Sequence, residues 1–165
     1  MIEVRIASVN ADATSGQPVL LLKPLEDTID RGDDRLLPIW IGQPEASAIM
    51  LALQGVDLPR PMTHDLLRDV IERVGYVVVR VEVTRLAEGT YYAAIVVQAE
   101  ERTLAIDARP SDAIALAVRA PCGIFVADDV WNQAAVTVQA VDEAEEEVER
   151  FREFLDHVDP SDFTS

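Results

Sequence analysis

Cysteine, histidine and aromatic residues are scarce in the sequence. Its 165 residues include one cysteine, Cys122, and two histidines, His64 and His157. A single cysteine excludes an internal disulfide and a cysteine-based zinc cluster, and two distant histidines argue against a histidine-rich zinc site or a two-histidine ribonuclease site. Cys122 is interpreted as a buried thiol, because free cysteine usually packs as a small hydrophobic residue.

Basic residues are also scarce, with 14 Lys and Arg against 30 Asp and Glu and a formal net charge of −16. Residues 140–165 hold ten acids and two bases, so the rest of the chain keeps a net charge of −8. Nonspecific nucleic-acid affinity comes mainly from Lys and Arg on phosphates. We therefore expect any binding of single-stranded nucleic acid to be weak, salt-sensitive and dependent on a local arginine cluster or on divalent cations.

Long apolar runs are absent, since no stretch approaches the roughly 20 residues that cross a bilayer. The segment 1–9 alternates like a strand and lacks the basic and apolar regions of a signal peptide. We expect a cytoplasmic protein with no membrane association. Its length suits one domain with a core that buries about 70% of the surface of the unfolded chain.

Hydrophobic periodicity predicts an α/β (α+β) single domain with a mixed, largely antiparallel sheet and helices packed on one side. Strands are expected at 1–9, 18–25, 36–41, 76–86, 90–99, 103–107 and 124–126, and helices at 44–54, 63–74 and 110–119. A turn with acidic residues at its start is expected at 128–132, and the proposed domain spans residues 1–138.

Residues 139–165 have a different character. Between Asp142 and Val158, apolar residues recur at spacings of three and four within an acidic run, which predicts an amphipathic helical tail. Such a helix could pack on the domain, pair with another subunit or bind a protein partner.

The most informative segment is 103–119, where an apolar strand breaks at Asp107 and resumes as an alanine-rich helix. Pro110 suits a first helical turn, and Asp112 suits the positive end of the helix dipole. Asp107, Arg109 and Asp112 therefore crowd one strand-to-helix corner. The segment 37–53 repeats this order of strand, proline, acid and small-residue helix, with Glu45 as the acid.

These sequence segments resemble those of the bifunctional nuclease domain family. The resemblance covers residues 1–138 and rests on several phrases in order: Leu37-Pro-Ile-Trp-Ile-Gly, Arg60-Pro-Met-Thr-His-Asp and Asp107-Ala-Arg-Pro-Ser-Asp-Ala-Ile-Ala-Leu-Ala. It implies cleavage of both RNA and DNA. It carries over no catalytic residue set, so the candidate site residues are chosen on chemical grounds.

Cleavage of DNA as well as RNA excludes the 2′-hydroxyl as the nucleophile, so water must attack. Mg²⁺ or Mn²⁺ held by carboxylates can activate water and neutralise the phosphate. Asp107 and Asp112 are the predicted metal ligands, Arg109 is the phosphate-binding candidate, and Glu45 joins them if the two helix starts lie side by side. The alternative is structural, with Asp112 in a first helical turn simply paired with Arg109.

His64 could act as a general base oriented by Asp65, because histidine titrates near neutral pH. A surface histidine is nevertheless the more usual case at a helix start, here after the predicted cap Thr63. Trp40, Tyr91 and Tyr92 could stack on unpaired bases. Core packing is favoured for Trp40, which lies between two isoleucines, and the two tyrosines should point to opposite sheet faces.

The sequence thus predicts metal-dependent hydrolysis of single-stranded RNA and DNA. The alternative is a non-catalytic regulatory or scaffolding protein that acts through protein partners. We also expect a homodimer that forms through apolar surface.

Overall fold

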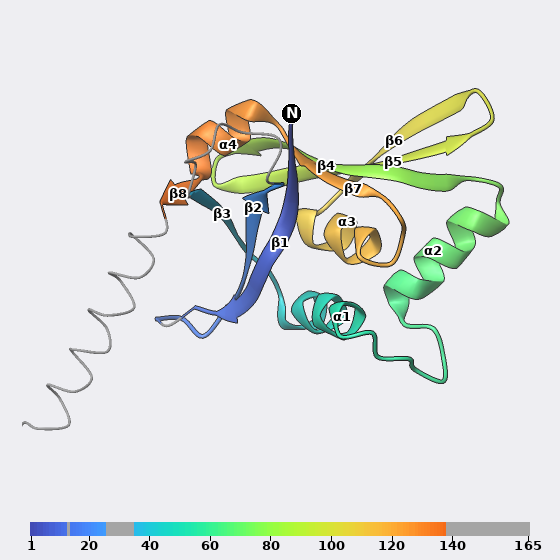
Figure 1. Ribbon diagram of the computed structural model, residues 1–165, viewed down its shortest axis with the longest axis horizontal. Helices are drawn as coiled ribbons and strands as arrows, with labels where there is room; N and C mark the ends of the chain where they lie inside the picture. Colours follow the sequence, from blue (N-terminus) through green and yellow to red (C-terminus); the bar gives the residue numbers. More distant parts are fainter. Residues whose placement is uncertain (13, 26–34, 138–165) are drawn as a thin grey trace, which may run out of the picture.

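The computed structural model describes residues 1–12, 14–25 and 35–137. The strands of these residues form one eight-stranded sheet in the order β6-β5-β4-β7-β1-β2-β3-β8 (Figure 1). The strands are β1 (Ile2–Ala11), β2 (Pro18–Pro24), β3 (Arg35–Trp40), β4 (Val77–Ala87), β5 (Thr90–Ala99), β6 (Arg102–Ala108), β7 (Gly123–Val126) and β8 (Val136–Thr137). The helices are α1 (Gln43–Leu53), α2 (Thr63–Arg73), α3 (Pro110–Ala117) and α4 (Asp128–Ala134).

The predicted α+β fold with a mixed, largely antiparallel sheet is confirmed. The segment expected to form an acidic turn is instead the helix α4, and Thr63 is the first residue of α2 rather than its cap. The predicted acidic tail lies outside the described residues. None of the described helices is long and apolar enough to cross a membrane.

The sheet consists of two antiparallel meanders joined by one strand. β1, β2 and β3 are neighbours in chain order, and so are β4, β5 and β6. β7 lies between the two meanders, parallel to β4 and antiparallel to β1. Ile124 of β7 accordingly pairs with Val81 on one side and with Val4 on the other. The two halves of the sheet therefore share one core.

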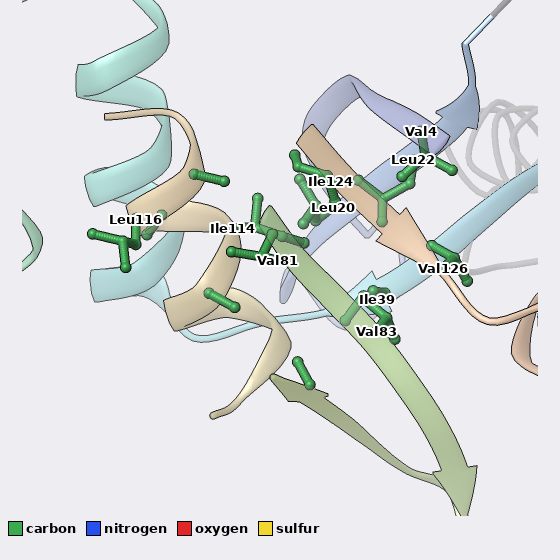
Figure 2. Packing of buried hydrophobic residues seen from close by; sticks show 14 of the residues in the cluster. Val4, Leu20, Leu22, Ile39, Val81, Val83, Ile114, Leu116, Ile124 and Val126 are labelled. Carbon is green, nitrogen blue, oxygen red and sulfur yellow. The ribbon is translucent and has the colours of Figure 1, made fainter. Parts of the chain in front are cut away.

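Helix α3 lies at the centre of that core. Its small alanine side chains allow close approach to neighbouring elements, and seven of its eight residues are buried. Figure 2 shows Ile114 of α3 beside Val81 of β4, within the cluster that includes residues of both meanders. The exception in α3 is Asp112, which is half-buried. The packing of α3 thus fixes the place of one carboxylate at its N-terminal end.

The sheet coils strongly, so that strands distant in the sheet order meet. The hydroxyl of Tyr91 on β5 donates a hydrogen bond of 3.1 Å to the carbonyl of Pro38 on β3. Desolvation by burial raises the pKa of Tyr91. Tyr92, on the other face of β5, lies with its ring centroid 3.8 Å from the guanidinium carbon of Arg85. The two tyrosines therefore have separate structural contacts.

The expectation that Trp40 packs in the core is wrong, because its side chain is 51% exposed. Ile39 and Ile41 take the buried positions, and alternation along the strand leaves Trp40 on the outer side. The buried tryptophan is Trp131 of α4, which is 1% exposed.

Candidate functional site

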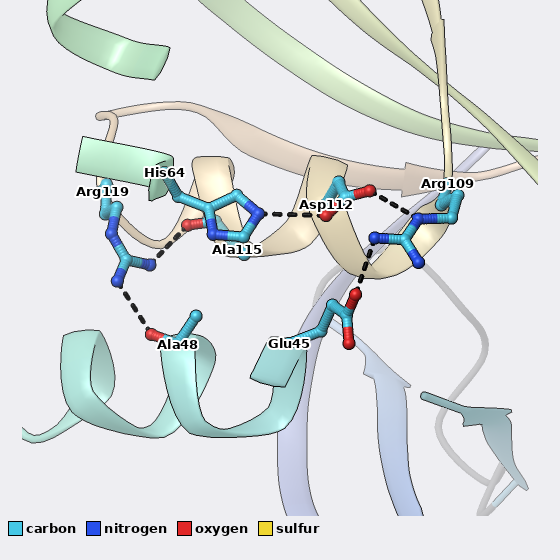
Figure 3. Close-up of polar contacts among 7 residues, drawn as sticks. All are labelled: Glu45, Ala48, His64, Arg109, Asp112, Ala115 and Arg119. Atoms are coloured by element: carbon cyan, nitrogen blue, oxygen red, sulfur yellow. Dashed lines mark hydrogen bonds and ion pairs between the residues drawn. The ribbon is translucent and has the colours of Figure 1, made fainter. Parts of the chain in front are cut away.

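The first turns of α1, α2 and α3 bring polar side chains together on the helical side of the molecule. Glu45 lies in the first turn of α1, His64 in that of α2 and Asp112 in that of α3. Arg109, the residue before α3, completes the group. We refer to these four residues as the Arg109 cluster (Figure 3).

Arg109 joins two helices through its guanidinium. Its Nε donates to Oδ2 of Asp112 at 2.7 Å, and its Nη2 donates to Oε1 of Glu45 at 2.6 Å. The hydrogen bonds to Asp112 and then Glu45 raise the pKa of Arg109, so its charge is secure. The side chain is nevertheless 65% exposed. One cation thus holds two carboxylates while remaining open to solvent.

His64 contacts the other oxygen of the same aspartate. Its Nε2 lies 3.1 Å from Oδ1 of Asp112, and the residue is only 8% exposed. The expectation of a surface histidine is therefore wrong, and the carboxylate beside His64 is Asp112 rather than Asp65. An ionised carboxylate only accepts hydrogen bonds, so in the neutral imidazole this contact places the proton on Nε2 and leaves the lone pair on Nδ1.

Asp112 is held in its ionised form. Partial burial acts to raise the pKa of its carboxyl group, but the hydrogen bonds from Arg109 and His64 outweigh this effect and the pKa is lowered from its ordinary value of 3.8. The position at the N-terminal end of α3 also favours negative charge. Asp112 can therefore orient both the guanidinium and the imidazole at neutral pH.

Arg119, just beyond α3, fixes the three helices relative to one another. Its Nη1 donates to the carbonyl of Ala115 at 2.7 Å, its Nη2 to that of Ala48 in α1 at 2.9 Å, and its Nε to Oδ1 of Asp65 in α2 at 2.5 Å. The other oxygen of Asp65 accepts a hydrogen bond from the backbone N–H of Met62 at the start of α2. This arginine therefore acts as a clamp behind the cluster.

Sequence reasoning missed Arg119 and assigned Asp65 a different role. Burial works to raise the pKa of Asp65, but the hydrogen bonds from Met62 and Arg119 outweigh it and lower that pKa. The one sequence signal for the clamp was an arginine at the end of an otherwise apolar helix. Its partners lie 54 and 71 positions away, beyond the reach of local patterns.

Asp107 is not among the contacts of the Arg109 cluster. It is exposed on β6 and pairs with Ala94, while its neighbour Ile106 pairs with Ile95 of the core cluster. Because side chains alternate along a strand, Asp107 lies on the sheet face opposite to Ile106. That Asp107 and Asp112 hold a metal together stays a prediction.

The fit of a divalent ion to the cluster depends on its carboxylates. In the part of the chain that the structure describes, no three side chains of His, Cys, Asp or Glu are placed to hold a metal together. Glu45 and Asp112, however, both reach one cation, the guanidinium of Arg109. Two carboxylates are a donor set that Mg²⁺ accepts when water and phosphate oxygens complete its coordination. The pair fits such an ion if Arg109 moves aside.

The chain is a compact α+β domain in which charged side chains meet at the starts of three helices. A model of the bifunctional nuclease domain matches residues 28–139, a span that contains all four residues of the Arg109 cluster. The chain belongs to the bifunctional nuclease domain family.

Relatives of the chain divide into two groups. Uncharacterized protein Rv1829 of Mycobacterium tuberculosis is 44% identical over 168 residues, which cover 98% of this chain and 97% of that protein. Bifunctional nuclease 1 of Oryza sativa subsp. japonica is 33% identical over 59% of this chain and 30% of its own length. Bifunctional nuclease 1 of Arabidopsis thaliana is 31% identical over 66% of this chain and 33% of its own length. Similarity to the plant proteins thus concerns about a third of each.

Proposed function

We propose that this chain is a metal-dependent nuclease that hydrolyses phosphodiester bonds of single-stranded RNA and DNA, with the Arg109 cluster as its catalytic centre. The observation that carries the proposal is the exposed guanidinium of Arg109, which lies between the carboxylates of Glu45 and Asp112 with His64 beside them. Membership of the bifunctional nuclease domain family supports the reaction class.

Arg109 is suited to bind a phosphate. Its Nε and Nη2 are used by the two carboxylates, whereas its Nη1 has no hydrogen-bond partner among the described residues. A planar guanidinium binds phosphate oxygens with defined geometry, and its charge would stabilise the negative charge of the transition state. Because the whole chain is strongly acidic, affinity should be weak and should fall as salt rises.

His64 is suited to accept a proton from the attacking water. Asp112 fixes its tautomer through Nε2, as the catalytic carboxylate does for a histidine base in other hydrolases. Nδ1 has no hydrogen-bond partner among the described residues, and no side-chain nitrogen or oxygen of these residues is both fully buried and unpartnered. Nδ1 therefore retains contact with solvent, where a water molecule can reach it.

Glu45 and Asp112 are the residues that would hold Mg²⁺ or Mn²⁺, with Arg109 then turned toward the phosphate. When bound, such an ion would lower the pKa of a coordinated water and neutralise charge on the phosphate. The geometry favours Glu45 over Asp107 as the partner of Asp112, because Glu45 and Asp112 share a cation and Asp107 does not.

The proposal is tested by incubating purified protein with end-labelled single strands of RNA and DNA in Mg²⁺, in Mn²⁺ and in chelator. Wild type should cut both strands with metal and neither with chelator. Asp112→Asn should reduce cleavage by a factor of about 100 or more, in the range expected for loss of a positioned catalytic group.

Two substitutions act as controls. Asp69→Asn alters an aspartate whose partner is its neighbour Arg68 on α2, outside the cluster, and should cut like wild type. Asp107→Asn separates the two metal hypotheses, since strong loss would assign Asp107 to the metal and normal activity would favour Glu45. Equal cleavage by wild type and Asp112→Asn would reveal a contaminating nuclease and overturn the assignment of the site.

A non-catalytic regulatory or scaffolding protein is the second candidate. It is favoured by the engagement of both oxygens of Asp112, which gives the cluster the contacts of a structural ion-pair network. If wild type neither binds nor cuts single strands at low salt with Mn²⁺ present, this second function becomes the better explanation.

A further inference from the structure

Strand β6 forms one edge of the sheet and is unusually open. Among the described strands it pairs only with β5, and all residues from Arg102 to Asp107 are exposed. Two of them are large apolar residues, Leu104 at 40% and Ile106 at 44% exposure. In Figure 1 the β5–β6 hairpin extends away from the helices, so its helix-side face is left uncovered at the tip.

Apart from the charges of Arg102 and Asp107, the edge lacks the features that usually prevent edge strands from pairing. Its register with β5 runs without a bulge from Arg102 to Ala108, and the strand contains no proline and no lysine. A regular, exposed edge with apolar side chains is a ready template for another strand. The sequence of this edge therefore indicates a partner strand rather than permanent contact with water.

The hairpin geometry determines which backbone groups of β6 face outward. A two-residue turn at Glu100 and Glu101 joins β5 to β6, and Glu100 has a left-handed φ of 49°. In such a hairpin the closing pair, here Ala99 and Arg102, is hydrogen-bonded and the pattern alternates from there. The outward N–H and C=O groups therefore belong to Thr103, Ala105 and Asp107.

We propose that β6 pairs with β6 of a second copy of this chain, antiparallel and with the two-fold axis at Ala105. This register overlaps the whole strand and sets Thr103, Ala105 and Asp107 against outward groups of the same kind. It places Leu104 opposite Ile106 of the partner subunit, so the exposed apolar side chains cover each other. The dimer would carry one continuous sheet across both copies.

Charge distinguishes this register from the one with its axis at Leu104. With the axis at Ala105, Glu101 lies opposite Arg109 of the partner subunit just beyond the strand ends, and no two like charges face each other directly. A slip of two residues that moves the axis to Leu104 sets Glu101 opposite Asp107 of the partner subunit at each end. Like charges directly opposite each other are destabilising. The edge is thus self-complementary, which is what a symmetric interface requires.

The interface would also affect the Arg109 cluster. β6 leads directly into Arg109, so pairing brings an acidic residue of the second copy to the border of the cluster. The proposal does not depend on the proposed nuclease function, because the dimer is detected by mass and by cross-linking.

The first test is sedimentation equilibrium of the full chain over a range of concentrations. Wild type should sediment at twice the chain mass, and Ala105→Pro should sediment as a monomer. Proline at Ala105 removes an outward N–H and leaves the ladder with β5 intact, as edge strands tolerate. Circular dichroism should show the same secondary structure for both proteins. A wild-type protein that stays monomeric at all concentrations overturns the proposal.

The second test reports the register and does not require the proline variant to fold. At the two-fold axis, Ala105 and its copy are a hydrogen-bonded pair about 5.5 Å apart at Cα, within the range of about 4.4–6.8 Å for a disulfide. Ala105→Cys should form a covalent dimer on mild oxidation. Thr103→Cys should not, because the two Thr103 positions would be offset by about 13 Å along the strands.

Wild type is the control for the native thiol of Cys122, which is half-buried. Equal or stronger cross-linking of Thr103→Cys, or cross-linking of wild type to the same extent as Ala105→Cys, overturns the proposed pairing.

Discussion

The guanidinium Nη2 of Arg109 lies 2.6 Å from Oε1 of Glu45, although the two residues are 64 positions apart in the sequence. This contact exists because α1 and α3 start side by side against the same sheet (Figure 3). Two similar sequence segments, each with an acidic residue in a first helical turn, thus contribute Glu45 and Asp112 to one charged group.

Replacing Arg109 with Lys should lower turnover more than binding. Lysine keeps the positive charge, but it cannot bind a phosphate with the fixed fork of a guanidinium. Single-turnover cleavage rates and filter-binding affinities for one labelled strand separate the two effects. Arg68→Lys, which changes a partner of the adjacent Asp69, is the matched control. An equal loss of rate and affinity would assign Arg109 to ground-state binding only.

Replacing Arg119 with Ala should destabilise the fold by about 3–5 kcal/mol, because it leaves a partly buried Asp65 without its partner. The side chain of Arg119 is 6% exposed, and two backbone carbonyls would also lose their donor. Denaturant unfolding followed by circular dichroism measures the free energy. Arg68→Ala, whose partner is the adjacent and more exposed Asp69, should change it by less than about 1 kcal/mol.

Acid should weaken the folded state through Asp65 and Asp112. Both carboxyl groups have a lowered pKa in the folded chain, so they stabilise it above the ordinary carboxyl pKa of about 4. That contribution is lost as the pH falls through their folded values. Unfolding free energies at about pH 6 and about pH 3 measure the loss, which should be smaller in Asp112→Asn. An unchanged pH dependence in this variant would contradict the role of its ion pair.

Truncation after Gln139 should leave a folded domain. The described core is complete by β8, and removing ten acids and two bases reduces the net charge from −16 to −8. Weaker repulsion should give equal or tighter binding to single strands. Thermal unfolding and a binding titration check both statements. Loss of cooperative unfolding would show instead that the tail completes the core.

Local patterns in the sequence predicted most of the elements, because helix starts and strand alternation depend on neighbouring residues. The starts of α1 and α3 are examples, and so is the break between β4 and β5, where Glu88 and Gly89 have φ values of 51° and 74°. The contact of Glu45 with the corner at Arg109 was predicted on the condition that the two helix starts lie side by side, and the structure meets that condition.

The remaining features depend on contacts that no local pattern contains. His64 is buried because α2 packs against α3, and it contacts Asp112, 48 positions away. Trp40 is exposed because its isoleucine neighbours occupy the inward positions. Alternation along the strand separates Trp40 from the isoleucines but does not say which of the two faces is buried. Asp107 and Asp112 are close in sequence but lie on either side of the strand-to-helix corner. Asp107 is exposed on β6, whereas Asp112 contacts Arg109 at the start of α3.

The position of β7 has a consequence for synthesis of the chain. Each meander is built from neighbouring segments and can form its hairpins as it leaves the ribosome, but β7 alone connects β4 to β1. Ile2 therefore cannot pair with Val126, its strand partner, until residue 126 has been synthesised. Such non-local pairing slows folding. During translation the first meander must persist with an unpaired edge, and a pause before residue 123 would prolong the interval in which that edge can aggregate.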